Sequence, residues 1–154
     1  MYQFQFKRTN SEDPDFISLV NLLNDDIRIT DGDDFDFYFQ FNALDTIKQV
    51  IVVYEHNIPV GCGALRPYTE DTIEIKRMFV HHAHRRKGIA ILLLGELEKW
   101  AVESGYTSAI LETGIKQTAA ISLYKRAGYS VIANYGQYAG VETSVCMRKA
   151  LVKP

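Results

Sequence analysis

The sequence predicts an α/β (α+β) fold, in which strands and helices pack in layers around one core. Short runs of alternating or β-branched residues recur along the chain. Two segments, 88–105 and 119–128, carry apolar residues at helical spacing and end in glycine. The length of 154 residues suits a single domain over 1–154, because domains commonly have about 100–150 residues.

The first elements predicted are a strand and a helix. Apolar and polar residues alternate over 2–7, which is the period of a half-buried strand. Asp13 and Pro14 then supply a helix cap and a first-turn proline, and apolar residues recur on one face to about Leu23. The segment 31–41 mixes aspartates with aromatic residues and has no clean period. We expect it to be a loop with a short helix.

The middle of the chain predicts an antiparallel hairpin. Residues 50–54 and 60–65 are apolar, and the tight connection at 56–59 joins them. A turn at 69–71 leads into a strand over 73–80. A long helix from Gly88 to Gly105 follows.

The last third predicts a strand, a helix and two strands. The strand covers 108–111, and the helix covers 119–127 and is closed by Gly128. The final strands are expected over 131–133 and 144–151.

Composition limits the class of partner. With 47% hydrophobic and 23% charged residues the chain is typical of soluble globular proteins. A net charge of −2 gives no basic surplus for nucleic acid. Residues 1–10 lack signal-peptide features, and no apolar run could span a bilayer, so we expect a cytoplasmic protein with no membrane partner. Cys62 and Cys146 lie in apolar runs and are expected to be buried free thiols.

A basic turn joins the strand 73–80 to the long helix. The first N–H groups of a helix are unpaired and lie at the positive end of its dipole. Gly88 would let a phosphate approach the backbone, and Arg85, Arg86 and Lys87 add positive charge, so a diphosphate would fit. The alternative is a basic surface turn. The GxxxxGK[ST] and GxGxxG patterns are missing, so we do not expect ATP or NAD.

Two motifs resemble those of the GNAT superfamily of N-acetyltransferases. Arg85, Gly88 and Ala90 match the signature Gln/Arg-x-x-Gly-x-Gly/Ala between a strand and a long helix. Residues 117–129 resemble the second motif, Asn-x-x-Ala-x-x-x-Tyr-x-x-x-Gly-Phe/Tyr, with Gln117 in place of the asparagine. The order and the spacing of both motifs agree with the family.

The resemblance implies a GNAT-like mixed, mostly antiparallel central sheet of six to seven strands with helices on both faces. It implies acetyl-CoA as the acyl donor, with its pantetheine arm between the strands 73–80 and 108–113, which would splay apart. An N–H of Phe79 or Val80 would polarise the thioester carbonyl. The residues expected to bind the cofactor are Met78, Phe79, Val80, Arg85, Arg86, Lys87, Gly88, Ile89, Ala90 and Gln117.

The resemblance also implies two catalytic residues. An amine must lose a proton before it attacks, and Glu74 resembles in position the glutamate base of the histone-acetylating branch. The alternative is a strand glutamate that faces solvent or pairs with Lys76. Tyr124 falls on the tyrosine of the second motif and would protonate the leaving thiolate, unless it is a core tyrosine beside Leu123.

Other reactive residues are given no catalytic role. His81, His82 and His84 cluster without a cysteine or carboxylate at zinc-site spacing, so we expect a polar turn and no metal. Cys62 is not expected to be a nucleophile, since similar proteins transfer the acetyl group directly.

The acceptor side is the least defined. In similar proteins the first helices, the loop between them and the last strands form its walls. The aspartates of 31–41 could attract a cationic amine that the aromatic rings stack upon, although a solvated acidic loop is the alternative. The candidate acceptor-binding residues are Asp34, Phe35, Tyr38, Tyr135 and Tyr138.

The expected function is acetyl-CoA-dependent N-acetyl transfer to a primary amine, by direct attack in a ternary complex. An acidic chain without an evident peptide-binding extension favours a small molecule or amino acid as acceptor over a protein. A non-catalytic acyl-CoA-binding sensor and a protein N-acetyltransferase are the alternatives. The sequence names neither the acceptor nor the oligomeric state, and a homodimer stays open.

Overall fold

A single seven-stranded sheet organises the computed structural model, which describes residues 3–31 and 46–152. The strand order is β1-β2-β3-β4-β5-β7-β6, and all neighbours are antiparallel except β4 and β5. The predicted fold class is confirmed. The strands are β1 (Phe4–Thr9), β2 (Gln49–Glu55), β3 (Ile58–Pro67), β4 (Thr72–Val80), β5 (Ser108–Gly114), β6 (Ser130–Ile132) and β7 (Ser144–Ala150). The described helices are α1 (Pro14–Asp31), α3 (Ile89–Glu103) and α4 (Thr118–Arg126), with short 3-10 turns η2 (His82–His84) and η3 (Gly136–Tyr138).

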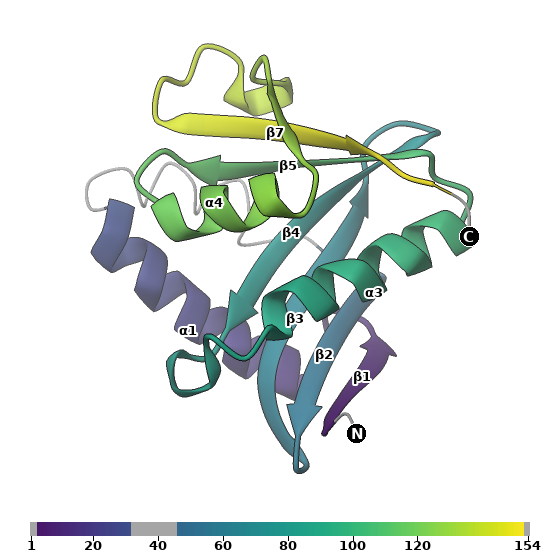
Figure 1. Cartoon of the computed structure of the whole chain (residues 1–154), viewed down its shortest axis with the longest axis vertical. Coiled ribbons are helices and arrows are strands. Elements are labelled where there is room, and N and C mark those ends of the chain that lie inside the picture. The colour runs from purple at the N-terminus through teal and green to yellow at the C-terminus, as the bar shows by residue number, and fades with distance from the viewer. Residues whose placement is uncertain (1–2, 32–45, 153–154) are drawn as a thin grey trace.

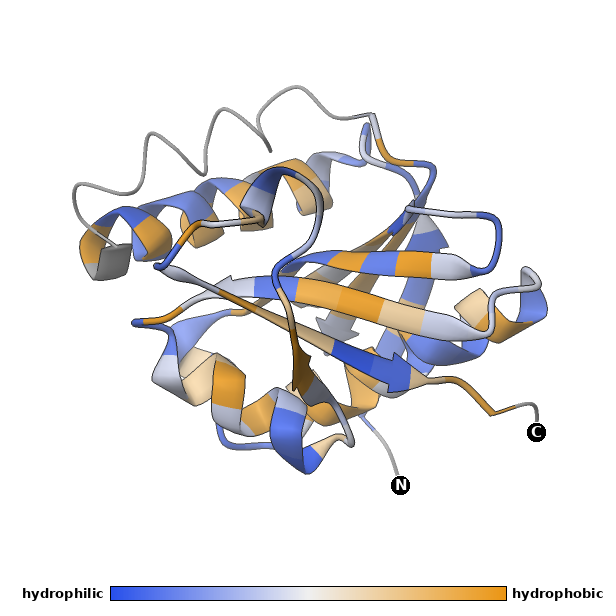
Figure 2. Cartoon of the chain, turned by 90° about the horizontal axis from the view of Figure 1, so that it is seen from above, coloured by the Kyte–Doolittle hydropathy of each residue, from blue (hydrophilic) through white to orange (hydrophobic). Residues whose placement is uncertain are grey.

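Helices cover both faces of the sheet. In Figure 1, α1 lies behind the sheet, and α3 and α4 lie in front of it. Side-chain alternation in β2 serves both faces, because Val50 and Val52 pack in the cluster that contains α1 and Ile51 and Val53 pack in the cluster that contains α3. Figure 2 shows hydrophobic stretches, in orange, in the strands between these two layers. Burial of each such side chain contributes about 1.5–3 kcal/mol.

Helix α1 is longer than the sequence analysis predicts. Its start is as expected, since Asp13 Oδ1 accepts hydrogen bonds from the N–H groups of Asp15 (2.9 Å) and Phe16 (3.3 Å). The predicted end near Leu23 is wrong, because the helix continues to Asp31. Ile27 follows Leu23 by one helical turn and keeps the same face in use. Residues 32–41 of the predicted loop 31–41 lie outside the described residues.

Two backbone features shape the centre of the sheet. His56 and Asn57 have positive φ (51° and 66°) and form the two-residue turn between β2 and β3, which shortens the predicted connection. Gly63 of β3 lies under α3, where an added Cβ would be 2.6 Å from Leu97 Cδ1. A glycine therefore lets this helix pack close to the sheet.

In the part of the chain that is described, no helix has the length and apolar character to cross a membrane.

Candidate active site

Strands β4 and β5 are paired only at their beginnings. Residues 72–75 pair in parallel with 108–111. Beyond this point β4 stays paired with β3 and β5 with β7, and the two strands diverge (Figure 1). The facing edges of these two described strands therefore have no sheet neighbour beyond the paired residues. Their main-chain groups are available to a ligand that enters between the strands.

A β-bulge changes the direction of side chains in the second half of β4. The register with β3 shifts by one residue between Cys62 and Ala64, and Arg77 adopts a φ of 60°. After this bulge Met78 packs against the cluster of α3, whereas Phe79 packs in the cluster of α1. Bulges next to active sites commonly redirect a side chain in this way.

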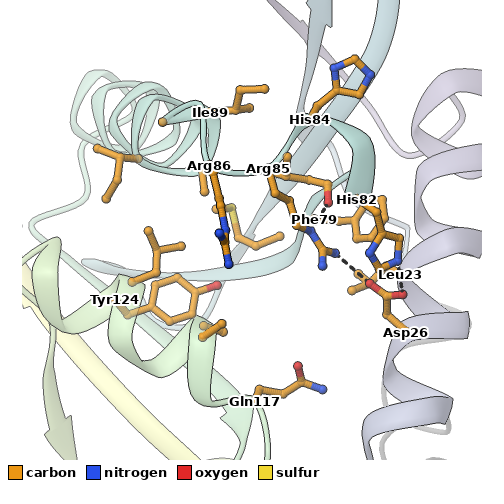
Figure 3. Close-up of a pocket in the computed structure, with 18 of the residues that line it drawn as sticks. Leu23, Asp26, Phe79, His82, His84, Arg85, Arg86, Ile89, Gln117 and Tyr124 are labelled. Carbon is orange, nitrogen blue, oxygen red and sulfur yellow. Dashed lines mark hydrogen bonds and ion pairs between the residues drawn. The ribbon is translucent and has the colours of Figure 1, made fainter.

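A cavity of about 730 Å³ lies where the strands diverge, and Figure 3 shows its wall. This volume is within the range of ligand sites, about 300–1,000 Å³. Helix α1 contributes Leu23, Asp26 and Ile27 to one side, and α4 contributes Tyr124 to another. The predicted cofactor-binding residues on the wall are Met78, Phe79, Val80, Arg85, Arg86, Gly88, Ile89, Ala90 and Gln117.

The turn before α3 exposes main-chain N–H groups. Gly88 is the N-cap residue of α3 and has a φ of 82°, in the left-handed region that favours glycine. A Cβ placed on Gly88 would meet no atom within 4 Å, so the backbone is open on that side. The first N–H groups of α3 lie at the positive end of its dipole. The start of α3 therefore has the open backbone that the predicted anion site requires.

Arg85 is held by two elements of the wall. Its Nε donates to the carbonyl of Val80 at 2.8 Å, and its Nη2 donates to Asp26 Oδ2 at 2.8 Å (Figure 3). The guanidinium also lies 5.7 Å from the centre of the Phe79 ring. Arg85 therefore links the end of β4 to α1.

The next two basic residues point in different directions. Arg86 lines the cavity and extends toward Tyr124 in Figure 3. The Nζ of Lys87 instead donates to Glu55 Oε1 at 3.1 Å, and Lys87 is not on the cavity wall. A direct contact between the Lys87 side chain and a ligand in this cavity is therefore not supported.

The histidines of the turn pair with carboxylates. His82 Nε2 lies 2.8 Å from Asp26 Oδ1, and His84 Nδ1 lies 2.8 Å from Glu55 Oε1. Within 3–31 and 46–152, no group of three or more His, Cys, Asp or Glu residues is placed to hold a metal ion. These two histidines thus connect the turn to α1 and β2.

The two cysteines are buried and reduced. Burial raises the pKa of the Cys62 thiol to about 12 and that of the Cys146 thiol to about 11. The Cys62 thiol also donates to the carbonyl of Arg77 (3.3 Å). A thiol with so high a pKa is a poor nucleophile at neutral pH.

Helix α4 supplies two predicted residues to the wall opposite β4. Gln117 is its N-cap residue, and Tyr124 lies two turns further along the helix. Tyr124 is 6% exposed, and its ring packs edge-on against Tyr129 with centroids 5.9 Å apart. Burial and the nearby charge of Glu112 raise the pKa of Tyr124 above its usual value. Its phenol therefore carries its proton at neutral pH.

Glu74 lies on the opposite face of the sheet from Tyr124. Its neighbours Ile73 and Ile75 pack in the cluster of α3, so alternation directs Glu74 away from that helix. Glu74 is 5% exposed, and its Oε2 accepts a hydrogen bond of 2.6 Å from the Tyr135 hydroxyl. Lys76 Nζ lies 3.9 Å from its Oε1. The interpretation of Glu74 as solvent-facing is wrong, whereas the pairing with Lys76 is present.

The loop between β6 and β7 brings two predicted acceptor residues to Glu74. The rings of Tyr135 and Tyr138 meet edge-on with centroids 5.7 Å apart, and Tyr68 contacts Tyr135 at 5.1 Å. Asn134 Nδ2 donates to two carbonyl groups in the following residues, which holds the loop. Neither tyrosine lines the cavity. The other candidates, Asp34, Phe35 and Tyr38, lie outside the described residues.

Two residues of the turn's surroundings were missed. Asp26 and Glu55 each contact two side chains of the turn, and neither is among the predicted site residues. Asp26 lies beyond the predicted end of the first helix. Glu55 was detectable only as an acidic residue that ends an apolar strand.

A class of acyl-transferring domain is defined by three features together. These are parallel strands that diverge, a glycine turn into a long helix, here α3, and a later helix that carries a tyrosine, here α4. The model of the acetyltransferase (GNAT) family matches residues 16–129, a range that contains all of these features. The chain belongs to the acetyltransferase (GNAT) family, and the predicted resemblance is confirmed.

Individual relatives agree with this family. The IAA acetyltransferase of Azospirillum brasilense is 38% identical over 93 residues, which cover 60% of this chain and 61% of that protein. The crystal structure of a Klebsiella pneumoniae protein described as a "putative acyl-CoA N-acyltransferase" is 28% identical, with a TM-score of 0.80 over 97% of this chain and 98% of that one. A GNAT family acetyltransferase from Elizabethkingia anophelis with acetyl-CoA bound shares the fold, at 18% identity and a TM-score of 0.72, over 98% of this chain and 100% of that one. The chain spans between 48% and 65% of the length of four curated relatives that it matches.

Proposed function

We propose that this chain transfers an acetyl group from acetyl-CoA to an amine, by direct attack while both substrates are bound. One observation carries the proposal. A single cavity joins the open N-terminus of α3, the unpaired edge of β4 and the buried phenol of Tyr124. This arrangement supports a diphosphate site, a channel for an extended arm and a proton donor along one path.

The residues of the cavity fit acetyl-CoA. The open backbone at Gly88 and the side chain of Arg86 suit the diphosphate, and the edge of β4 beyond residue 75 suits the amides of the pantetheine arm. Acetyl-CoA supplies an activated acetyl thioester. The main-chain N–H of Val80, which faces away from β3 in this register, would stabilise the negative charge that develops on its carbonyl oxygen.

Glu74 and Tyr124 divide the proton transfers between the two faces of the sheet. Glu74, on the face of α1, would accept the proton of the incoming amine, and Tyr135 orients its carboxylate. Tyr124, on the face of α3, would donate a proton to the departing sulfur. Beyond residues 75 and 111 the two strands are not paired, so an amine and a thioester would meet there from opposite faces of the sheet.

We further propose that the acceptor is a small primary amine or an amino acid rather than a protein. The net charge of −2 does not repel a cationic amine. The rings of Tyr68 and Tyr135 near Glu74 are not fully buried, so such a cation can stack on them. The name of the Azospirillum brasilense relative, IAA acetyltransferase, is compatible with a small acceptor.

A thiol-release screen tests the proposal. Purified protein and acetyl-CoA are incubated with small amines, polyamines, amino acids and N-terminal peptides, and the acetylated product is identified by mass spectrometry. We expect release of CoA with at least one small amine, in equal amount to its acetylated product. Release with peptides alone would indicate a protein N-acetyltransferase, and CoA binding without release in any case would indicate a sensor.

A further inference from the structure

Glu55 holds the turn before α3 from the end of β2. Its side chain is only 5% exposed. Its Oε1 lies 2.8 Å from His84 Nδ1 and accepts from Lys87 Nζ at 3.1 Å, while Gln3 Nε2 donates to its Oε2 at 2.6 Å. The hydrogen bonds from His84 and Lys87 lower the pKa of Glu55, so the carboxylate is charged at neutral pH. A buried, charged anchor thus connects the sheet to both ends of the segment 84–87.

A second carboxylate holds the same turn from α1. Asp26 Oδ1 lies 2.8 Å from His82 Nε2, and Asp26 Oδ2 accepts from Arg85 Nη2 at 2.8 Å. Four side chains of the turn are therefore divided between two anchors, namely His82, His84, Arg85 and Lys87.

Arg86 is directed at the cavity and makes none of the contacts with these two anchors. Arg86 lies between Arg85 and Lys87, and it lines the cavity (Figure 3). Its φ of 67° is unfavourable for a residue with a side chain. Bonds on either side of Arg86 can hold it in this conformation, because Arg85 is fixed to Asp26 and Lys87 to Glu55.

We propose that Glu55 is a positioning residue for the diphosphate of coenzyme A. Glu55 holds Lys87 and His84 in place and does not touch the ligand itself. This proposal rests on the proposed function, since it assumes that coenzyme A binds at the start of α3. Glu55 is absent from the cavity wall, so any effect of Glu55 on binding is indirect. Its anchoring would pre-organise the N–H groups at the start of α3 and the side chain of Arg86.

The sign of the effect separates positioning from simple electrostatics. Coenzyme A is a polyanion, and a carboxylate near its diphosphate repels it. If charge alone mattered, Glu55→Gln would tighten binding. If Glu55 positions the turn, the same substitution weakens binding, because an amide holds Lys87 and His84 less strongly than a carboxylate does.

The test is the Kd of coenzyme A for the wild type and for Glu55→Gln, measured by titration calorimetry. We expect the Kd to rise about tenfold, with kcat at saturating acetyl-CoA unchanged. The matched control is Glu98→Gln, which weakens another ion pair, Glu98 to Lys149 (2.9 Å), away from the turn. It should lower the Tm without changing the Kd. An unchanged or lower Kd in Glu55→Gln overturns the proposal.

A second variant keeps the test decisive if Glu55→Gln does not fold. Lys87→Met alters a side chain that is 41% exposed. We expect faster hydrogen exchange at residues 84–88 in the free protein and a raised Kd; unchanged exchange overturns the proposal. Where both single variants fold, the double variant should bind no worse than Glu55→Gln alone, and full additivity would instead mean that Lys87 contacts the ligand directly. Failure of the wild type to bind coenzyme A would refute the proposed function itself.

Discussion

Tyr135 donates its phenolic hydrogen to Glu74 Oε2 at 2.6 Å, which joins the loop after β6 to the first part of β4. The carboxylate is 5% exposed, so this contact fixes its direction in a site with little water. Lys76, two residues along the strand, lies 3.9 Å from the other oxygen. The orientation of the proposed base therefore depends on a residue that is 61 positions away in sequence.

Glu74→Gln tests the proposed base. At pH 7 we expect kcat to fall about 10²–10⁴-fold, the usual contribution of a general base, with the Kd of coenzyme A unchanged. The loss should shrink as pH rises toward the pKa of the acceptor amine, which then deprotonates in solution. Glu142→Gln, at an exposed position, is the control. Equal kcat in Glu74→Gln and wild type would remove Glu74 from the mechanism.

Tyr124→Phe tests the proposed acid. Loss of the hydroxyl should lower kcat at least about 10²-fold and leave the KM for acetyl-CoA nearly unchanged, because the ring still fills the wall. Tyr129→Phe is a close control: its hydroxyl bonds to Glu98 (2.8 Å), and Tyr129 is not on the cavity wall. It should affect stability and spare kcat. A raised KM with normal kcat in Tyr124→Phe would assign Tyr124 to binding alone.

Gly88→Ala tests the main-chain site at the start of α3. A side chain at a φ of 82° costs about 1–2 kcal/mol, and its Cβ would enter the space open to a phosphate. We therefore expect a lower Tm and a Kd for coenzyme A raised at least about tenfold. Gly95→Ala, inside α3 with open space around it, should raise the Tm slightly and keep the Kd. A normal Kd in Gly88→Ala would speak against a phosphate contact there.

Stability should fall in alkaline solution because of buried phenols. Burial first, and then neighbouring carboxylates, raises the pKa of Tyr124, Tyr129 and Tyr135 above the usual value of about 10. Above about pH 10 the phenols of the unfolded chain release protons that the folded chain keeps. The free energy of unfolding therefore declines by about 1.4 kcal/mol per pH unit for each phenol. Denaturant unfolding between pH 9 and 11 measures this slope. Tyr135→Phe should make the slope shallower, and an identical slope would contradict the assignment.

The sequence predicted those elements whose signals are local. The helix from Gly88 to Gly105 has helical periodicity with a glycine at each end, and the structure places α3 between them. The diverging strands followed from the family motifs and not from periodicity. The predicted end of α1 is too early, because the apolar face of the helix continues past Leu23 to Ile27.

The contacts that orient the site could not be predicted, because they join distant segments. Nothing local in the sequence indicates that Tyr135 lies on Glu74, or that the Lys87 side chain turns to Glu55 instead of the cavity. A run of basic residues shows only that positive charge is present. The direction of each side chain depends on tertiary partners, here carboxylates on β2 and α1.

The most direct test of the proposed coenzyme A site is hydrogen exchange at single-residue resolution, with and without coenzyme A near millimolar concentration. We expect binding, with protection of the amides at 88–91 and of Met78 to Val80, because the wall of the cavity contains the start of α3 and the free edge of β4. Absence of binding, or protection confined to other elements, would contradict the proposed site.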